Sequence, residues 1–268
     1  MKLNRSHVTA MQGFTLVELV AVLVILGIVA GIGSQFIVTT VDSYRKTELR
    51  MKLISRGRAS IEQMVRQLRN ALPNSVRVSA SGSCLEYIPI VGGANYLTTV
   101  ADDENGIVTP SNVIPTAPFV IGLGEVRYAA IGVFNPAEIY SNSTSLAAAS
   151  VSGGSPYSSI QLASNHRFDR NSINKRVYLT DFPKRFCLTG GALLQYYGYG
   201  LSVSGITDSS PSGSAALLLA TNVASVGDVF TLSPGSENRN AVITIEVEFM
   251  EREESVVLDG TVLVRNVP

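Results

Sequence analysis

The 268-residue sequence has only two histidines, His7 and His166, and it lacks the common catalytic motifs. It contains no G-x-S-x-G nucleophile elbow, no G-x-x-x-x-G-K-[ST] phosphate loop and no H-E-x-x-H zinc pattern. Its two cysteines, Cys84 and Cys187, are too far apart for a C-x-x-C site, and the acidic turn DDENG (102–106) lacks the alternating spacing of a calcium loop. The sequence therefore predicts no enzyme, no metal site and no cofactor.

Net charge is also absent: 21 basic residues balance 21 acidic ones, so bulk charge does not suggest a nucleic-acid partner. The charges are nevertheless separated along the chain. Residues 42–72 carry eight Lys or Arg against three acids, a net of +5, whereas residues 241–268 carry six acids against two Arg, a net of −4. Either these segments attract each other, within one subunit or between neighbours, or each is a solvated face.

The N-terminus has the pattern of a targeting segment. Residues 1–13 are polar, with Lys2 and Arg5 and no acid, and residues 19–41 form a run of 23 residues without a charge. Such a run is long enough to span a bilayer as a helix, which needs about 20 apolar residues. No A-x-A-like cleavage site closes it at signal-peptide length. The basic leader is expected to stay cytoplasmic, which orients the rest of the chain outward.

The stretch GFTLVELVAVLVILGIVA (13–30) resembles the class III signal of type IV prepilins and type II secretion pseudopilins. The resemblance implies that a membrane prepilin peptidase cleaves between Gly13 and Phe14 and N-methylates Phe14, leaving a mature chain of 255 residues. One departure is Gln12, because many members of the family have a basic residue before the glycine. The resemblance also implies that the chain is a substrate of the peptidase and acts by self-association.

Glu18 is the one charge near the start of the apolar run. A carboxylate in hydrocarbon costs roughly 2.5 to 3.5 kcal/mol, so it needs a partner or a role. The resemblance supplies one, because Glu18 would neutralise the new α-amino group of Phe14 on a neighbouring subunit and so set the register of assembly. The alternative is an acid that is merely tolerated at a helix N-terminus near the membrane interface.

The pattern beyond the apolar run predicts an α+β, pilin-like fold. Apolar residues from Leu49 to Leu72 recur at helical spacing, and Pro73 provides a stop. We expect a leader (1–13), a transmembrane or filament-core half of a helix (14–41), its amphipathic half (42–72) and a mainly antiparallel β head (73–268).

Several segments of the head have the pattern of strands. They are SVRVSA, CLEYIPIV, VRYAAIGVF, KRVYLT and LLQYYGYGL, and AVITIEVEFM is expected to turn through EREES into a second strand near 256–264. The segments SNSTSLAAASVSGGSPYSS (141–159) and SGITDSSPSGSAA (204–216) have the composition of exposed, mobile loops.

The two cysteines of an exported head are candidates for a disulfide, because such bonds persist outside the cytoplasm. A bridge between Cys84 and Cys187 would close a loop of about 100 residues and add up to ~4 to 5 kcal/mol of stability in the chain-entropy model. The alternative is two separate buried thiols.

The patches YLTDFPKRFCL (178–188) and VRNVP (264–268), together with the spread cysteines, resemble a minor pilin of the mannose-sensitive haemagglutinin (MSHA) pilus, itself similar to J-type minor pseudopilins. The resemblance implies a role in initiating or assembling a filament, and the tip of the filament is one position that such a subunit can take. The implied partners are prepilin peptidase, major and minor pilins and, indirectly, an inner-membrane platform and its ATPase. The implied location is the inner membrane, with a periplasmic head, and then the pilus.

Two alternatives remain open from the sequence. The first is a J-type minor pseudopilin of type II secretion. The second is a tip adhesin, in which Tyr196, Tyr197 and Tyr199 stack on sugars rather than pack a pair of strands.

Overall fold

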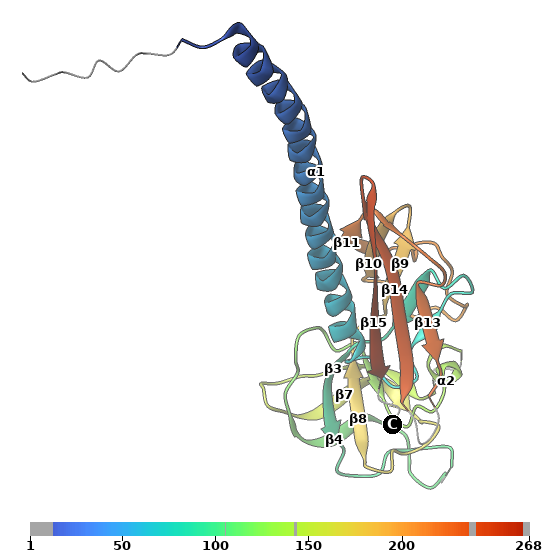
Figure 1. Cartoon of the computed structure of the whole chain (residues 1–268). Coiled ribbons are helices and arrows are strands. Elements are labelled where there is room, and N and C mark those ends of the chain that lie inside the picture. Colours follow the sequence, from blue (N-terminus) through green and yellow to red (C-terminus); the bar gives the residue numbers. More distant parts are fainter. Residues whose placement is uncertain (1–12, 105, 142–143, 236–239, 265–268) are drawn as a thin grey trace, which may run out of the picture. The chain divides into compact units, whose positions relative to one another are not determined.

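A computed structural model describes residues 13–104, 106–141, 144–235 and 240–264. The expected leader lies outside these ranges except for Gly13, as does most of VRNVP. The chain separates into two units, Met1–Leu49 and Arg50–Pro268, and helix α1 (Leu16–Leu68) contributes to both (Figure 1). The predicted α+β class is confirmed, because one long helix precedes a head of antiparallel sheets.

From Leu19 to Val41, within the first unit, α1 carries no charged residue on any side. Its large hydrophobic side chains, from Leu16 to Val41, are all exposed. Mean hydropathy reaches 2.7 over an 18-residue window, none of which is buried. Within the described ranges, α1 is the one helix long and apolar enough to cross a membrane.

The last part of α1 ends four residues earlier than the expected Leu72. The N–H groups of Asn70 and Ala71 bond to the carbonyls of Gln67 and Leu68, which tightens the final turn. The N–H of Leu72 then bonds to the carbonyl of Ile88 at 2.8 Å. The chain leaves the helix because pairing with the segment after β2 replaces the next helical bonds.

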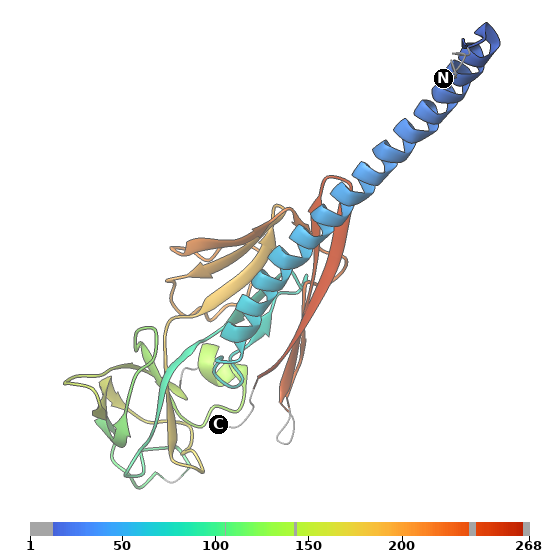
Figure 2. The same ribbon diagram turned by 60° about the vertical axis from the view of Figure 1, so that its left-hand side comes forward.

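Two sheets of the head lie on opposite sides of the last part of α1. The five-stranded sheet has the order β1 (Arg77–Val78), β2 (Cys84–Tyr87), β9 (Lys184–Thr189), β10 (Ala192–Tyr197), β11 (Ala215–Thr221). The second sheet has β14 (Ala241–Glu251) between β12 (Val223–Ala224) and β13 (Phe230–Ser233), and β15 (Glu254–Val264) also pairs with β14. Figure 2 shows the head portion of α1 running between these two sheets.

The main core fills the space between the helix and both sheets. Leu53, Met64 and Leu68 of α1 are completely buried, in one cluster with Phe186 of β9 and Phe249 of β14. The second sheet approaches α1 closely, because a Cβ built on Gly260 of β15 would lie 2.5 Å from Cγ2 of Ile61. Burial of this stripe, at about 25 cal/mol per Å² of apolar surface, holds α1 in the head.

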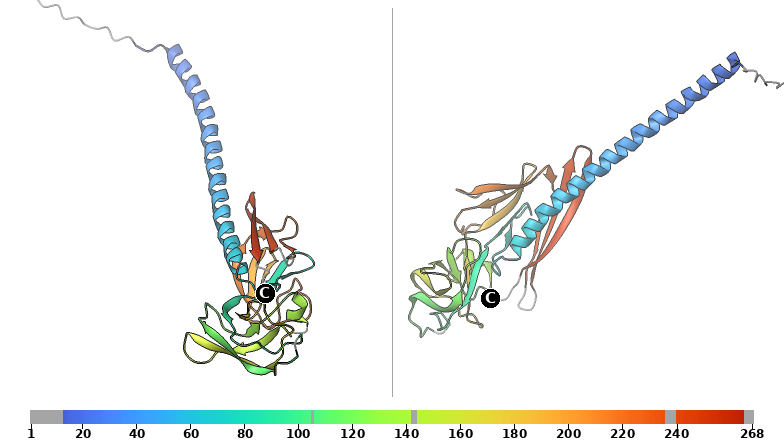
Figure 3. Two further views of the ribbon diagram at one scale, coloured as in Figure 1. Left: turned by 90° about the horizontal axis from the view of Figure 1, so that it is seen from below. Right: turned by 90° about the vertical axis from the view of Figure 1, so that its left-hand side faces the viewer.

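A six-stranded antiparallel sheet forms a separate lobe of the head (Figure 3). Its order is β3 (Ile90–Asn95), β8 (Arg176–Thr180), β5 (Tyr128–Ala130), β6 (Leu146–Ser150), β7 (Tyr157–His166), β4 (Ser111–Phe119). A bridge between Tyr96 and Thr116 brings the two edges of this sheet together just beyond β3. The short helix α2 (Pro136–Tyr140) begins at Asn135, whose side chain accepts the N–H of Glu138.

The strand predictions succeed where residues alternate and miss strands without a clear pattern. All five internal predicted segments overlap observed strands, and the terminal hairpin pairs β14 with β15 over its whole length. The prediction of an exposed loop over 141–159 is wrong for 146–150 and 157–159, which belong to β6 and β7, but correct for 151–156, which lie outside the strands and are largely exposed. Burial of Leu146 and Ala147 in the core of the lobe outweighs the low strand propensity of this serine- and alanine-rich stretch.

The basic helix and the acidic hairpin attract each other within one subunit. Nε of Arg50 lies 2.5 Å from the Glu254 carboxylate, and Nη2 of Arg56 lies 3.6 Å from that of Glu251. These acids flank the two-residue turn of the β14–β15 hairpin. The hypothesis of attraction within a subunit is thus confirmed for these two pairs.

Candidate processing and assembly site

The expected cleavage site lies just before α1 begins. Gly13 and Phe14 are outside the helix and exposed, and Phe14 is 77% exposed. A peptide bond outside regular structure is open to a peptidase, whereas a bond inside a helix must first be unwound. The geometry is therefore compatible with cleavage between these two residues.

Thr15 caps the N-terminus of α1. Its Oγ1 accepts the backbone N–H of Glu18 at 3.3 Å, and its carbonyl accepts the N–H of Leu19 at 3.2 Å. Thr15 and Glu18 thus occupy the N-cap and N3 positions of a T-x-x-E sequence, the signature of a capping box. The apolar helix starts at a defined residue because this cap satisfies one of its free donors.

The Glu18 side chain has no ion-pair partner among the described residues of its own chain. Its place in the first turn of α1 is favourable, since the positive end of the helix dipole attracts an acid. That attraction is worth only about 0.3 to 1 kcal/mol at an exposed site, less than the cost of a carboxylate in hydrocarbon. Capping alone does not offset that cost.

Comparison with known families matches residues 9–34 to the Prokaryotic N-terminal methylation motif. This motif and the long apolar helix support a type IV pilin-like class. No curated protein and no solved structure shows significant similarity to the chain. The motif is typical of structural subunits that are membrane-anchored, processed by prepilin peptidase and assembled with other pilins.

In the head of this pilin-like chain, a disulfide joins β2 to β9. Cys84 and Cys187 are direct partners in the antiparallel register, with Cα atoms 4.2 Å apart, and both are fully buried. The cystine lies on the face of the sheet away from α1, with Tyr196 and Tyr199. It therefore links two neighbouring strands of the five-stranded sheet.

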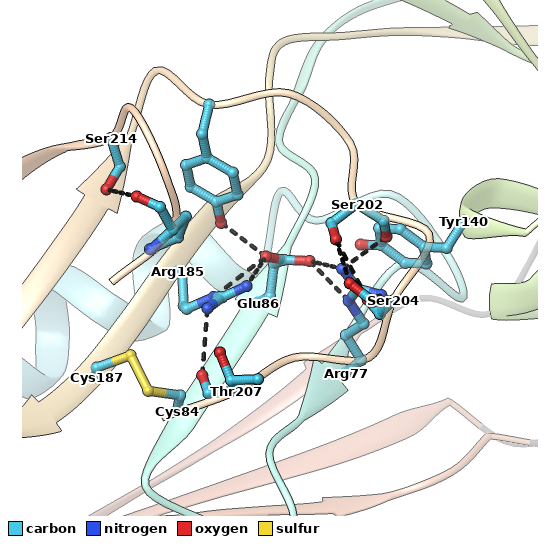
Figure 4. Close-up of polar contacts among 12 residues, drawn as sticks. Arg77, Cys84, Glu86, Tyr140, Arg185, Cys187, Ser202, Ser204, Thr207 and Ser214 are labelled. Carbon is cyan, nitrogen blue, oxygen red and sulfur yellow. Dashed lines mark hydrogen bonds and ion pairs between the residues drawn. A yellow bond between two sulfur atoms is a disulfide. The ribbon is translucent and has the colours of Figure 1, made fainter. Parts of the chain in front are cut away.

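A buried ionic cluster lies beside the cystine (Figure 4). The Glu86 carboxylate, 1% exposed, accepts bonds from Arg77 Nε at 2.7 Å, Arg185 Nη2 at 2.8 Å and the Tyr199 hydroxyl at 2.9 Å. The guanidinium of Arg77 also lies over the Tyr140 ring, 3.8 Å from its centroid. This cluster was not predicted from the sequence.

The same two arginines hold the serine-rich segment 198–214. Arg77 donates to the carbonyls of Ser202 and Ser204, and Arg185 donates to those of Thr207 and Ser209. The segment 204–216, predicted as an exposed loop, is exposed at most of its residues, but β11 begins within it at Ala215 and the carbonyls of Ser204, Thr207 and Ser209 accept bonds from these arginines. Buried guanidinium groups need several acceptors, and the carbonyls of this loop supply them.

The tyrosines of LLQYYGYGL pack in the head. Tyr196 and Tyr199 are 7% and 6% exposed, whereas Tyr197 is 44% exposed. A platform of three exposed tyrosines for a sugar is thus absent from this segment, and packing inside the head is confirmed for Tyr196 and Tyr199 but not for Tyr197.

The remaining polar candidates have structural partners. His166 Nε2 lies 2.8 Å from the carbonyl of Thr144, and its ring packs edge-on against Phe168. In the acidic turn, Asp103 and Glu104 pair with Arg167 and Arg170. In the described ranges, no three His, Cys, Asp or Glu side chains are grouped so that they could hold a metal.

Burial raises the pKa of Tyr87, Tyr140 and Tyr199, and the Glu86 carboxylate adds to the effect at the last two. A tyrosine ionises near pH 10 in the unfolded chain, so its contribution to stability is complete below about pH 10 and is lost above it. We expect the unfolding free energy to fall by up to ~1.4 kcal/mol per pH unit for each of these tyrosines. Denaturant unfolding at a series of alkaline pH values measures this slope.

The variant Tyr87→Phe is the control for the alkaline slope. It retains the buried ring but removes one ionising hydroxyl, so its stability should depend less steeply on pH. Stability that stays constant well above pH 10 would show that these tyrosines ionise in the folded chain at the same pH as in the unfolded chain, which would contradict the raised pKa values.

Proposed function

We propose that this chain is a minor pilin of an MSHA-like type IV pilus, similar to the minor pilin known as MshO, and that it helps to initiate or assemble the filament. The observation that carries the proposal is the N-terminal junction. An exposed Gly13–Phe14 bond precedes a capped apolar helix with Glu18 in its first turn, within the matched methylation motif. We propose cleavage between Gly13 and Phe14 and N-methylation of Phe14.

In the proposed filament, Glu18 pairs with the α-amino group of Phe14 on a neighbouring subunit. The absence of an ion-pair partner for Glu18 within the described part of its own chain supports this role. Both groups are charged, and in an apolar core each would be costly to bury without the other. The need to pair these two charges would fix the axial register between neighbouring subunits.

A minor rather than a major role is favoured by the size of the head. Arg50–Pro268 comprises a helix segment and three sheets, and such a bulky unit is hard to repeat along a tightly packed filament. The proposed partners are prepilin peptidase, other major and minor pilins, and an inner-membrane platform with its ATPase. The proposed route runs from the inner membrane, with the head in the periplasm, to the pilus.

The deciding experiment is the intact mass and N-terminal sequence of the chain from membrane and sheared-filament fractions, with and without reduction. We expect a chain that begins at N-methylated Phe14, occurs in trace amounts with filaments and gains two hydrogens on reduction. A chain that begins at Met1 and stays in the membrane would refute the pilin proposal. Deletion of the gene separates a pilus role from a J-type pseudopilin, since the first predicts loss of pili and the second loss of secretion.

A further inference from the structure

A groove of about 1200 Å³ lies in the head between the six-stranded lobe and the end of α1. One wall is formed by β3 and by Arg176 and Tyr178 of β8. The other is formed by Arg69, just after α1, and by Leu263 of β15. The groove is partly open to solvent and is not an enclosed cavity, so another chain could enter it.

Strand β3 presents unpaired backbone groups to this groove. It is an edge strand, and β8 is its neighbour on one side. The N–H of Tyr96 bonds to the carbonyl of Lys175, so by the antiparallel alternation Ala94 also bonds toward β8. The N–H and C=O groups of Gly93 and Asn95 therefore point the other way, where no strand pairs with them in the described chain.

Other segments close the edge only at its two ends. At the start of β3, the N–H of Gly122 bonds to the carbonyl of Val91 at 2.7 Å. Just after β3, the bridge from Tyr96 to Thr116 resumes pairing. The open stretch between them is centred on Gly93, whose lack of a side chain lets another backbone approach closely, whereas the backbone of Val120 and Ile121 already lies against Gly92.

The charges and the exposed apolar surface of the groove indicate which kind of segment it could bind. Arg69 and Arg176 are its charged lining residues, and among the residues that the structure describes no acid lines it. Neither guanidinium has a carboxylate within 4.0 Å in the described residues, and that of Arg176 contacts the Tyr178 hydroxyl. Leu123 is fully exposed and Leu263 is 60% exposed, so both offer uncovered apolar surface.

We propose that this groove binds an extended acidic segment of a partner protein by strand addition to β3. Backbone bonds to Gly93 and Asn95 would supply affinity, and the two arginines and the exposed leucines would select acidic and apolar side chains that alternate along the segment. Under the proposed function, a neighbouring pilin is the natural source of such a segment. Binding of the segment would not depend on whether the filament serves adhesion or secretion.

The test uses the full processed chain in detergent and two labelled peptides. One alternates valine with glutamate, and the other alternates valine with lysine. Fluorescence anisotropy should show saturable binding of the glutamate peptide and at least about tenfold weaker binding of the lysine peptide. The double variant Arg69→Gln/Arg176→Gln should weaken binding of the glutamate peptide by about tenfold.

The matched control is Arg58→Gln/Arg66→Gln, which removes the same charge from exposed positions of α1 outside the groove. It should bind as the wild type does. A third variant, Gly93→Pro, removes an outward N–H on an edge strand and should reduce binding of the glutamate peptide with the arginines intact. If this variant unfolds, the two arginine pairs still decide the result.

Three outcomes would overturn the proposal. They are no saturable binding of the glutamate peptide, equal loss in the control and groove variants, and self-association through Arg69 and Arg176, which would make a second copy the occupant. None of these outcomes bears on N-terminal processing. Failure of the groove and failure of the pilin assignment are therefore distinguishable.

Discussion

The variant Glu86→Gln is expected to lower the unfolding free energy of the head by roughly 3–5 kcal/mol, the usual cost of removing one partner from a buried ion cluster. The side chains of Arg77 and Arg185 are only 14% and 5% exposed, and both pair with this carboxylate. Glutamine has nearly the same volume but no charge. It would leave two buried guanidinium groups facing each other without a counterion.

Denaturant unfolding of the oxidised chain measures this loss. The segment 198–214 should also become more sensitive to limited proteolysis, because its backbone is held by the same two arginines. The matched control is Glu125→Gln, which removes an exposed partner of Arg127 and should cost less than about 1 kcal/mol. Equal effects of the two variants would show that the Glu86 cluster is not a stabilising centre.

The variant Glu18→Gln is expected to reduce incorporation into filaments by about a hundredfold or more, since a buried charge left without its partner costs roughly 3–5 kcal/mol. Processing should continue, because the cleaved bond lies before the helix. The start of the helix should persist as well, since glutamine is accepted at the same position of a capping box. Quantitative immunoblotting of sheared filaments measures incorporation, and intact mass measures processing.

A second variant separates charge from capping. Thr15→Val removes the hydroxyl that accepts the Glu18 N–H, at a cost of about 1 kcal/mol to the helix, but keeps the carboxylate. It should therefore be incorporated far better than Glu18→Gln. If Glu18→Gln enters filaments normally while Thr15→Val does not, Glu18 acts in this chain as a capping residue and not as a register group.

Part of the missed cluster could have been found from the sequence. Once Cys84 and Cys187 are assumed to be paired antiparallel neighbours, Glu86 and Arg185 must also be opposite each other and on the same face. An acid inside the otherwise apolar CLEY and an arginine two residues before the second cysteine are the signals. Arg77 follows in the same way from the β1–β2 hairpin, where it is opposite Glu86.

The contribution of the loop 198–214 could not have been found in this way. Its carbonyls carry no side-chain signature, so their use as acceptors depends on where the chain passes over the sheet. The same holds for β6, whose alanines are strand residues only because the lobe buries one face of them. Local propensity is weak in such stretches, and long-range packing decides their structure.

By itself, the sequence determined the features that depend on neighbours along the chain. These are the uncharged run of 23 residues, the capped start of α1 with Glu18 in its first turn, and the alternation that builds β14 and β15. Periodicity and local hydrogen bonding leave a direct record in the order of residues.

Only the tertiary structure decided which distant groups meet. It placed Arg77 and Arg185 around Glu86, turned Tyr196 and Tyr199 inward, and left the edge of β3 open beside Arg69 and Arg176. These arrangements depend on the order of strands in each sheet and on what covers each face. Sheet order brings together residues far apart in the chain, so no local pattern records it.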